Sequence, residues 1–258
     1  MIFVAAGTQD GRELAGRLLS EGYPVTASVV SKYGSELLAM YPGMKINDKP
    51  LDEEGLSEYI KSHDIRVFVD ASHPYAANVS QNAMNACRKA KVPYIRYERQ
   101  ATAVNCKKLT VVENYEQAAE AAVKHGKTIF LTTGSRNIQK FLQSPYLAGC
   151  RIVARILPTA DVISEVTSLG LSPKDIIAMQ GPFSREFNRE MFRQYSADVI
   201  ITKNSGSIGG TDTKFSAADD LGLPVILVDK PAIKYDNLAT DFDTVIKFVA
   251  GQINLEVK

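Results

Sequence analysis

Short apolar runs alternate along the whole chain with longer amphipathic stretches. Residues 2–6 form an apolar run, and the stretch that follows places Leu14, Leu18 and Leu19 on one helical face. A buried strand followed by an amphipathic helix is the unit from which parallel sheets are built, because the helix carries the chain back across one face of the sheet. The pattern therefore predicts an α/β chain with parallel strands.

The first hundred residues contain enough of these units for one compact domain. The expected strands are residues 2–6, 25–30, 66–70 and 94–97. The expected helices are residues 12–20, 34–40, 51–62 and 75–90. Glycine and proline between them, as in the Gly22 to Pro24 turn, favour the breaks that this alternation needs.

The pattern restarts beyond a polar stretch at residues 100–108. The expected strands are residues 109–112, 128–132, 151–155, 176–179, 198–202 and 225–228, and the expected helices are residues 115–125, 161–168, 183–195, 214–221 and 244–250. This repeat predicts a second α/β domain facing the first, with a division into residues 1–98 and 99–258. A single doubly wound sheet is the alternative, because no Gly-rich or Pro-rich linker marks the boundary.

The composition excludes several classes of protein. The 258 residues are 45% hydrophobic and 23% charged, which is the balance of an ordinary globular chain and not of a disordered or fibrous one. The chain has 30 Lys and Arg against 29 Asp and Glu, so its formal net charge is +1. No global field attracts nucleic acid or an acidic membrane surface. Any site for an anion must therefore be built locally.

The sequence carries no signal for a membrane span, a secretory route or a metal. No apolar run approaches the roughly 18 to 20 residues that span a bilayer, and residues 1–7 lack the basic flank of a secretion signal. We therefore expect a cytoplasmic protein. Cys87, Cys106 and Cys150 are odd in number and widely spaced, which favours buried thiols over a disulfide framework or a zinc site.

A glycine-bearing turn joins the first strand to the first helix. Gly7 and Gly11 lie where glycines in dinucleotide-binding units let the backbone approach a pyrophosphate at a helix N-terminus. The spacing is not G-x-G-x-x-G. A phosphate loop and a plain tight turn with Asp10 as the helix N-cap are therefore equal alternatives.

The end of the second strand lacks the acid that often binds the ribose of NAD. It reads Ser28-Val29-Val30-Ser31-Lys32. Hydroxyl and ammonium groups at this place favour NADPH over NADH, because they can accept a 2′-phosphate. The alternative is that Lys32 is an ordinary solvated surface residue.

Two other strand ends in the first domain carry candidate chemistry. Asp70, Ser72 and His73 leave the carboxyl end of the third strand together, and ligands of open α/β sheets bind at that edge. The alternative is that His73 only holds the turn by a hydrogen bond to Asp70. Arg96 and Arg99 follow the fourth strand, where guanidinium groups suit carboxylate recognition. A salt-bridged domain boundary is the alternative for that pair.

The second half places basic and glycine-rich segments at strand ends. Residues 132–136 repeat the arrangement of strand, glycine turn and helix, and Arg155 ends another strand. The loop between Lys203 and Lys214 is dense in glycine and hydroxyl groups that can surround a ligand with backbone amides. A mobile loop is the alternative. Neither G-x-x-x-x-G-K-[ST] nor G-x-S-x-G is present, so nucleotide hydrolysis and nucleophilic hydrolysis are not supported.

Five ordered segments together resemble the precorrin-6A reductase family of corrin-ring biosynthesis. They are Gly7-Thr8 with residues 11–15, residues 70–76, 96–99 and 132–134, and residues 203–206 with Gly210, Thr211 and Lys214. The resemblance implies two Rossmann-like domains, the first of them dinucleotide-binding, with a cleft between the domains. It implies an oxidoreductase of cobalamin biosynthesis. Such an enzyme delivers a hydride from NAD(P)H to the C18=C19 double bond of precorrin-6A or cobalt-precorrin-6A.

The resemblance also implies roles for particular residues. The implied coenzyme contacts are Gly7, Thr8, Asp10, Arg12, Ser31, Lys32, Ser72, Thr133 and Gly134. The implied substrate contacts are Arg96, Arg99, Arg136, Lys203, Asn204, Ser205, Gly206, Thr211 and Lys214. Asp70 and His73 are the candidate catalytic residues for a proton relay, with bulk water as an equal alternative.

The resemblance leaves the coenzyme and partners as expectations. We expect NADPH, with NADH as the alternative, and a polycarboxylate tetrapyrrole substrate that is handed over between neighbouring enzymes of the pathway. We expect no nucleic-acid or membrane partner and no metal. Two other functions stay open. A reductase of small carbonyl compounds would normally use a Tyr-x-x-x-Lys pair, which is not well placed here, and a non-catalytic dinucleotide sensor would not need the loop between Lys203 and Lys214.

Overall fold

The fold comes from a computed structural model of the chain, which describes residues 1–99, 106–203 and 211–255. It forms two units. Unit 1 consists of residues 1–100 and 231–258, and unit 2 consists of residues 101–230. Each unit contains a six-stranded sheet in which all the strands are parallel. The expected fold class is therefore confirmed, and the alternative of a single sheet is wrong.

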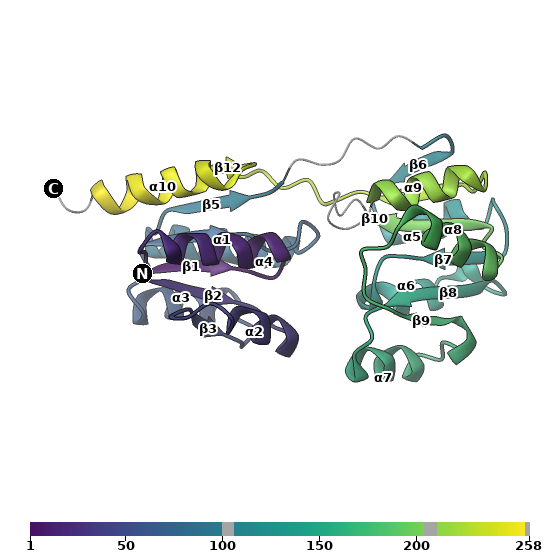
Figure 1. The fold of residues 1–258 in the computed structure, drawn as a ribbon, viewed down its shortest axis with the longest axis horizontal. Coiled ribbons are helices and arrows are strands. Elements are labelled where there is room, and N and C mark those ends of the chain that lie inside the picture. The colour runs from purple at the N-terminus through teal and green to yellow at the C-terminus, as the bar shows by residue number, and fades with distance from the viewer. Residues whose placement is uncertain (100–105, 204–210, 256–258) are drawn as a thin grey trace. The chain divides into compact units, whose positions relative to one another are not determined.

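The sheet of unit 1 has the strand order β12-β5-β4-β1-β2-β3 (Figure 1). Its strands are β1 (Ile2–Ala5), β2 (Val25–Ser28), β3 (Lys45–Asn47), β4 (Val67–Asp70), β5 (Tyr94–Tyr97) and β12 (Leu238–Ala239). Its helices are α1 (Gln9–Ser20), α2 (Lys32–Leu38), α3 (Glu53–Ser62), α4 (Ala77–Ala90) and α10 (Phe242–Leu255). The register pairs Ala5 with both Ser28 and Asp70, so these strands end at one edge of the sheet.

The two faces of this sheet bury separate hydrophobic clusters, because alternate residues of a strand point to opposite faces. Ile2 and Val4 of β1 pack with apolar residues of α1 and α10, whereas Phe3 and Ala5 pack with apolar residues of α3 and α4. All four strand residues are less than a tenth exposed. Helices on both faces of a fully buried parallel strand are what the continuous apolar run at residues 2–6 predicted.

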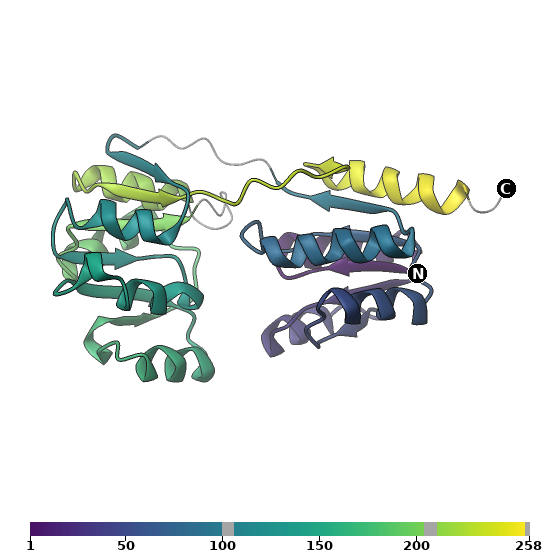
Figure 2. The ribbon, with the colours of Figure 1, turned by 180° about the vertical axis from the view of Figure 1, so that it is seen from behind.

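The C-terminal segment belongs to unit 1 and not to the second domain, where the expected division at 99–258 had placed it. Figures 1 and 2 show β12 beside β5 and the yellow α10 next to it. Leu238 pairs with Arg96, and Ala239 pairs with Tyr97. Val245 of α10 is completely buried in the core of unit 1. The return of residues 231–258 adds an edge strand and covers apolar surface that residues 1–98 alone would leave exposed.

The sheet of unit 2 has the strand order β6-β11-β10-β7-β8-β9. Its strands are β6 (Leu109–Val112), β7 (Thr128–Leu131), β8 (Arg151–Ile156), β9 (Ile176–Ala178), β10 (Val199–Lys203) and β11 (Val225–Val228). Its α-helices are α5 (Tyr115–Ala122), α6 (Ile138–Leu142), α7 (Ala160–Ser168), α8 (Arg185–Gln194) and α9 (Thr211–Asp220). Among the described residues, no helix is long and apolar enough to cross a membrane.

The core of unit 2 is also divided by its sheet. Residues of α5, α6 and α7 pack with Val199 and Ile201 on one face. Residues of α8 and α9 pack with Ile200 and Val153 on the other face. Because strand residues alternate between the faces, Lys203 lies on the α5 face and Arg155 lies on the α8 face. This difference decides which side chains the basic residues meet.

Candidate functional site

The turn after β1 is fixed by Thr8, which is the N-cap of α1. Its hydroxyl accepts a hydrogen bond from the Gly11 N–H at 2.9 Å and donates one to the Ala71 carbonyl at 3.1 Å. The N-cap is therefore Thr8 and not Asp10, because α1 begins at Gln9, three residues earlier than its apolar pattern indicated. The same hydroxyl connects the turn after β1 to the segment after β4, so two strand ends of unit 1 are held together.

The two glycines of this turn have different roles. A Cβ at Gly11 would lie 2.8 Å from the Ala71 carbonyl oxygen and 3.0 Å from the Ala6 Cα, so the close approach of α1 to the sheet requires glycine there. A Cβ at Gly7 would meet nothing within 4 Å. The space over Gly7 is therefore open at the N-terminus of a helix, the kind of place where backbone N–H groups and the helix dipole favour an anion.

Asp10 and Arg99 form an ion pair beside this turn. The Arg99 Nη2 lies 2.7 Å from the Asp10 Oδ2, and Asp10 is only 5% exposed. Burial raises the pKa of this carboxyl, and the charge of Arg99 acts in the opposite direction. The Arg99 Nη1 is buried and has no hydrogen bond to any described residue. Arg99 therefore retains an unused donor next to the phosphate-loop candidate.

The end of β2 carries hydroxyl and amide groups. The Ser31 hydroxyl caps α2 by accepting a hydrogen bond from the Gly34 N–H at 3.0 Å, and the Asn47 side chain donates to the Ser28 hydroxyl at 2.9 Å. Ser31 and Lys32 are exposed, and Arg12 is partly exposed. None of these groups is a carboxylate.

Asp70 at the end of β4 is completely buried and surrounded by donors. Its Oδ1 accepts hydrogen bonds from the Ser72 N–H at 3.0 Å and from Arg96 Nη1 at 2.9 Å. Its Oδ2 accepts from the hydroxyls of Ser80 and Tyr94, both at 2.6 Å. Burial alone would raise the pKa of this carboxyl, but the Arg96 charge and these hydrogen bonds together hold it below its usual value.

Asp70 therefore positions the side chains around it, and the proton relay expected of Asp70 stays a prediction. Its carboxylate holds Ser72, Ser80, Tyr94 and Arg96 in one network, in which both of its oxygens already have two donors. Arg96 is 1% exposed, and it also donates to the Ser72 hydroxyl at 3.0 Å. The Arg96 guanidinium is directed into the protein, at Asp70, and the substrate contact expected of Arg96 stays a prediction.

His73 is partly exposed in the segment that follows. Its Nδ1 accepts a hydrogen bond from the Tyr75 N–H at 3.2 Å, and its carbonyl accepts one from the Ala76 N–H at 2.8 Å. In a neutral imidazole with an accepting Nδ1, the ring proton is on Nε2. The ring contact that fixes the turn is thus made to Tyr75, and His73 stays the candidate acid of this edge.

The carboxyl edge of unit 2 carries one basic group of side chains around Tyr115, which we call the Tyr115 cluster. Its members are Tyr115, Arg136, Asn137, Lys140 and Lys203. The ammonium groups of Lys203 and Lys140 lie 5.6 Å and 5.3 Å from the centre of the Tyr115 ring, and the Asn137 amide donates to its hydroxyl at 3.1 Å. Burial, with a contribution from Arg136, lowers the pKa of Lys203 to about 8.

A second basic group, the Arg155 cluster, lies on the other face of the same sheet. Its members are Arg155, Phe183, Asn188, Thr213 and Lys214. The Arg155 guanidinium lies 4.3 Å from the centre of the Phe183 ring and donates to the side-chain oxygen of Asn188, Oδ1, at 2.7 Å. Lys214 is 5% exposed, and burial together with the Arg155 charge lowers its pKa to about 7.

The remaining predicted residues are placed as follows. Thr133 is buried, and its hydroxyl oxygen has no hydrogen bond to a described residue. Gly134 has a φ of 79°, a backbone conformation that favours glycine. Asn204, Ser205 and Gly206 lie outside the described residues, as does the side chain of Thr211. The sequence did not predict three further residues of these clusters, Asn188, Phe183 and Tyr115. They lie on helices or loops far apart in the chain, and no sequence motif contains them.

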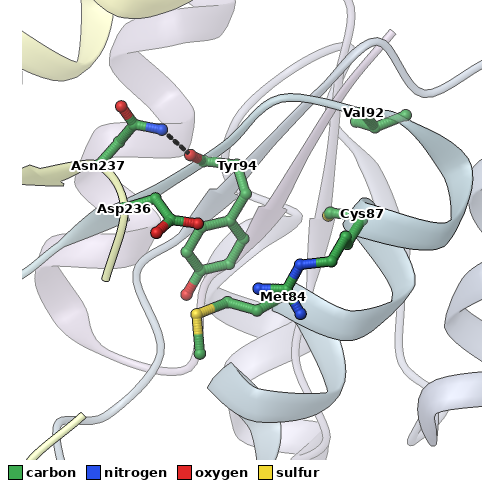
Figure 3. Close-up of a pocket in the computed structure, with 7 residues that line it drawn as sticks. Met84, Cys87, Val92, Tyr94, Asp236 and Asn237 are labelled. Carbon is green, nitrogen blue, oxygen red and sulfur yellow. Dashed lines mark hydrogen bonds between the residues drawn. The ribbon is translucent and has the colours of Figure 1, made fainter. Parts of the chain in front are cut away.

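A pocket elsewhere in unit 1 is formed where α4 meets the returning C-terminal segment (Figure 3). The Asn237 side chain there donates to the Tyr94 carbonyl at 2.9 Å. The lining consists of Met84, Cys87, Arg88, Val92, Tyr94, Asp236 and Asn237. None of these belongs to the predicted site, so the pocket gives no support for a coenzyme or substrate position.

The three cysteines differ in burial. Cys87 is buried, and burial raises the pKa of its thiol to about 12, whereas Cys106 and Cys150 are only partly buried. All three are free thiols. In the part of the chain that the structure describes, no group of His, Cys, Asp and Glu could hold a metal ion.

Comparison with known proteins gives one family over nearly the full length of the chain. The family model described as "Precorrin-6x reductase CbiJ/CobK" matches residues 1–250. A cobalt-precorrin-6A reductase of Priestia megaterium is 40% identical over 253 residues, which are 98% of this chain and 99% of that protein. One from Methanocaldococcus jannaschii is 35% identical and covers 97% and 98% of the two chains.

A solved structure has the same fold. It is described as "CobK precorrin-6A reductase" and is 23% identical in sequence. The match covers 97% of this chain and 96% of that chain, with a TM-score of 0.78.

Proposed function

This chain belongs to the precorrin-6x reductase family, and on that premise we propose that it reduces the macrocycle of precorrin-6A or cobalt-precorrin-6A in cobalamin biosynthesis. The observation that carries the proposal is the match over nearly the full length of relatives with this name, at up to 40% identity. The chain is an oxidoreductase of this family, and its coenzyme is a nicotinamide dinucleotide. When bound, the reduced nicotinamide supplies the hydride.

The turn after β1 fits the pyrophosphate of such a coenzyme. Gly7 leaves open space beside the first turn of α1, and Arg99 has an unused buried nitrogen nearby. We assign the pyrophosphate to Gly7 and Thr8, with the Asp10–Arg99 pair beside it. Ser72 and the segment at Thr133 and Gly134 stay predicted coenzyme contacts.

NADPH is the proposed form of the coenzyme. The end of β2 presents Ser31 and Lys32, with Arg12 on α1, and no carboxylate follows the strand to bind a ribose 2′-hydroxyl. An ammonium or guanidinium group there would instead bind a 2′-phosphate. Lys32→Gln is expected to raise the KM for NADPH several-fold and to leave the KM for NADH unchanged. An equal change for both coenzymes would contradict the assignment.

The macrocycle carries several carboxylates, which the proposal assigns to basic side chains. The Tyr115 cluster of unit 2 supplies Lys203 and Arg136. A substrate contact at Arg99 stays a prediction from the sequence. In the proposed reaction one carbon of the C18=C19 bond receives a hydride, for which a C–H bond of the reduced coenzyme would break, and the other carbon receives a proton from an acid. Two C–H bonds form on the macrocycle, its C18=C19 π bond is consumed, and the coenzyme would leave in its oxidised form. The Nε2–H of His73 is the proposed proton source.

The test of the reaction is an anaerobic assay with purified protein. Addition of NADPH and cobalt-precorrin-6A, or of precorrin-6A, is expected to consume one coenzyme per macrocycle and to bleach the chromophore in the same time course. Protein with coenzyme alone is the control. Coenzyme oxidation with a small carbonyl compound but not with a macrocycle would favour another reductase, and binding without oxidation would favour a dinucleotide sensor.

A matched pair of glycine variants tests the coenzyme position. Gly7→Ala is expected to leave the melting temperature unchanged, because its Cβ meets nothing, and to raise the Kd for the coenzyme about tenfold or more by occupying the space of the pyrophosphate. Gly11→Ala is expected to lower stability by about 1–3 kcal/mol, because its Cβ would displace α1 from Ala71. An unchanged coenzyme Kd in Gly7→Ala would move the pyrophosphate elsewhere.

His73→Gln tests the proton source. General acid catalysis by a positioned side chain contributes about a hundredfold or more, so kcat is expected to fall by that factor while the Kd for the coenzyme stays constant. An unchanged kcat would assign the protonation to water. The cytoplasmic location and the hand-over to neighbouring enzymes of the pathway stay predictions from the sequence.

A further inference from the structure

A buried cation and a partly buried one in the Arg155 cluster have no described carboxylate partner. Lys214 on α9 is 5% exposed, and it forms neither a hydrogen bond nor an ion pair with any described residue. Arg155 on β8 is partly buried, and its described polar contact is to the neutral amide of Asn188. Buried lysine and arginine side chains are normally paired, because removing a charge from water is costly.

Specific contacts fix the side chains around Arg155. Asn188 is 1% exposed, and its amide donates to the Ser184 carbonyl at 2.9 Å and to the Phe183 carbonyl at 3.3 Å. These bonds set the orientation of the amide, so its oxygen is directed at Arg155 Nη1. The Phe183 ring lies against the guanidinium from another side. Arg155 is therefore held by α8 and by the loop before it.

The Arg155 guanidinium has N–H groups that donate to no described residue. Nη1 donates to Asn188, whereas Nε and Nη2 make no hydrogen bond to the described residues. A guanidinium presents its N–H groups in a planar fork that matches the two oxygens of a carboxylate. The Lys214 ammonium, which feels the charge of Arg155, adds a second cation to the same place.

We propose that Arg155 and Lys214 form a subsite for a carboxylate of the macrocycle, with Asn188 as the residue that positions Arg155. The inference rests on the proposed function for the identity of the ligand. It adds a second basic subsite on the α8 face of the sheet, whereas the Tyr115 cluster lies on the α5 face. A substrate with several carboxylates can use both. A phosphate of the coenzyme is the other anionic group present in the reaction, and the test separates the two.

The proposal predicts an unusual combination of effects for Lys214→Met. The thioether side chain keeps most of the apolar volume and removes a buried charge that has no described counter-ion, so the melting temperature is expected to rise. The KM for the macrocycle is expected to rise about ten- to hundredfold through loss of a charge-assisted hydrogen bond, and the KM for NADPH is expected to stay constant. A merely structural lysine would give a lower melting temperature instead. Lys174→Met, an exposed lysine of unit 2, is the control expected to change neither quantity.

Asn188→Ala and a binding measurement complete the test. Asn188→Ala is expected to raise the same KM, because Arg155 loses its fixed orientation, while Asn188→Asp is expected to hold Arg155 but to weaken carboxylate binding through its own charge. A rise in the KM for NADPH alone in Lys214→Met would assign the subsite to a coenzyme phosphate and overturn the proposal. Unchanged KM values for both ligands would also overturn it.

The subsite can be tested even if the proposed reaction is not observed. Citrate serves as a polycarboxylate probe, and it is expected to raise the melting temperature of the unmodified protein more than that of Lys214→Met. If the protein binds citrate in this way but does not reduce the macrocycle, the proposed function fails and the carboxylate subsite stands. If it reduces the macrocycle but Lys214→Met responds to citrate like the unmodified protein, the subsite fails and the function stands.

Discussion

Both units bury charged side chains at the carboxyl edges of their sheets, but they balance these charges in opposite ways. In unit 1, Asp70 and Arg96 are almost completely buried and form an ion pair across neighbouring strands. In unit 2, Arg155 contacts an amide and an aromatic ring, the like charge of Lys214 acts on it, and neither has a described carboxylate partner. The first pair has its counter-charge within the protein, and we propose that an anionic ligand supplies the counter-charge of the second.

The difference distinguishes buried charges that stabilise the fold from buried charges that are expected to bind a ligand. An ion pair in which both partners have their hydrogen bonds stabilises a fold only if it stays intact, because removal of one partner leaves the other buried and unpaired. A pair of buried cations without a counter-ion lowers stability in the free protein and is expected where a ligand brings the missing charge. Four predictions follow from this comparison, from the largest expected effect to the smallest.

Replacement of Arg96 by methionine is expected to have the largest effect. Arg96→Met leaves the Asp70 carboxylate buried without its cation, so the free energy of unfolding is expected to fall by about 3–5 kcal/mol in urea denaturation. Arg17→Met is the matched control, because Arg17 pairs with Asp243 on the surface of the same unit. There the loss is expected to be about 1 kcal/mol or less. Equal losses in the two variants would remove the distinction between the buried and exposed pairs.

Asp70→Asn is expected to change the acid limb of the stability profile. The pKa of Asp70 is lower in the folded chain than in the unfolded chain, so its ionised form contributes stability above the unfolded value of about 4. That contribution is lost as the pH falls through the folded pKa. The unmodified protein is therefore expected to lose stability more steeply below about pH 4 than Asp70→Asn. Parallel acid limbs in pH-dependent denaturation would contradict this assignment.

Lys214 is expected to make the free energy of unfolding depend on pH above about pH 7, because folding lowers the pKa of this basic group. Its pKa falls from 10.5 to about 7 on folding, so between these values the unfolded chain binds more protons than the folded chain. Stability then rises with pH across this window, whereas Lys214→Met lacks the slope. Urea denaturation of both proteins from about pH 7 to about pH 10 measures it. A flat profile for the unmodified protein would show that folding does not lower the pKa of Lys214.

The smallest effect concerns the Tyr115 cluster. Burial and the Arg136 charge lower the pKa of Lys203 to about 8, so Arg136→Gln is expected to raise it, although not to the ordinary value, because burial is the larger cause. Lys140→Gln is the control, since Lys140 contacts the same ring but does not contribute to the shift. NMR titration of labelled lysine side chains measures both. An unchanged pKa of Lys203 in Arg136→Gln would show that the charge of Arg136 does not act on Lys203.

The sequence predicted the regular elements well where their hydrophobic pattern was strong. Most strands of both sheets lie within the expected ranges, because a fully buried parallel strand reads as an apolar run of four to six residues. Two strands were missed. Lys45–Asn47 and Leu238–Ala239 are too short to show a period, and the second is stabilised by pairing with β5 rather than by its own sequence. The domain boundary after β11 was missed for the same reason.

The candidate site divides in a similar way. The Gly7 turn and the basic strand ends were visible as local motifs. The pairing of Asp70 with Arg96 was not, because it depends on the register between β4 and β5, which places these two residues side by side. Asn188 and Phe183 were also invisible, since they reach Arg155 only through the packing of α8 and its preceding loop against β8.

The sequence by itself determined the class of fold, the family and the residue types at the strand ends. These properties follow from hydrophobic period and from local motifs, which need no knowledge of distant contacts. Only the tertiary structure decided which of the charged residues are neutralised within the protein. Burial and partner distance set the energy of a charge, and both depend on segments far apart in the chain. In the sequence, Asp70 and Lys214 are equally good candidates for a functional site. In the structure, Asp70 accepts hydrogen bonds from four donors, whereas Lys214 has no described partner.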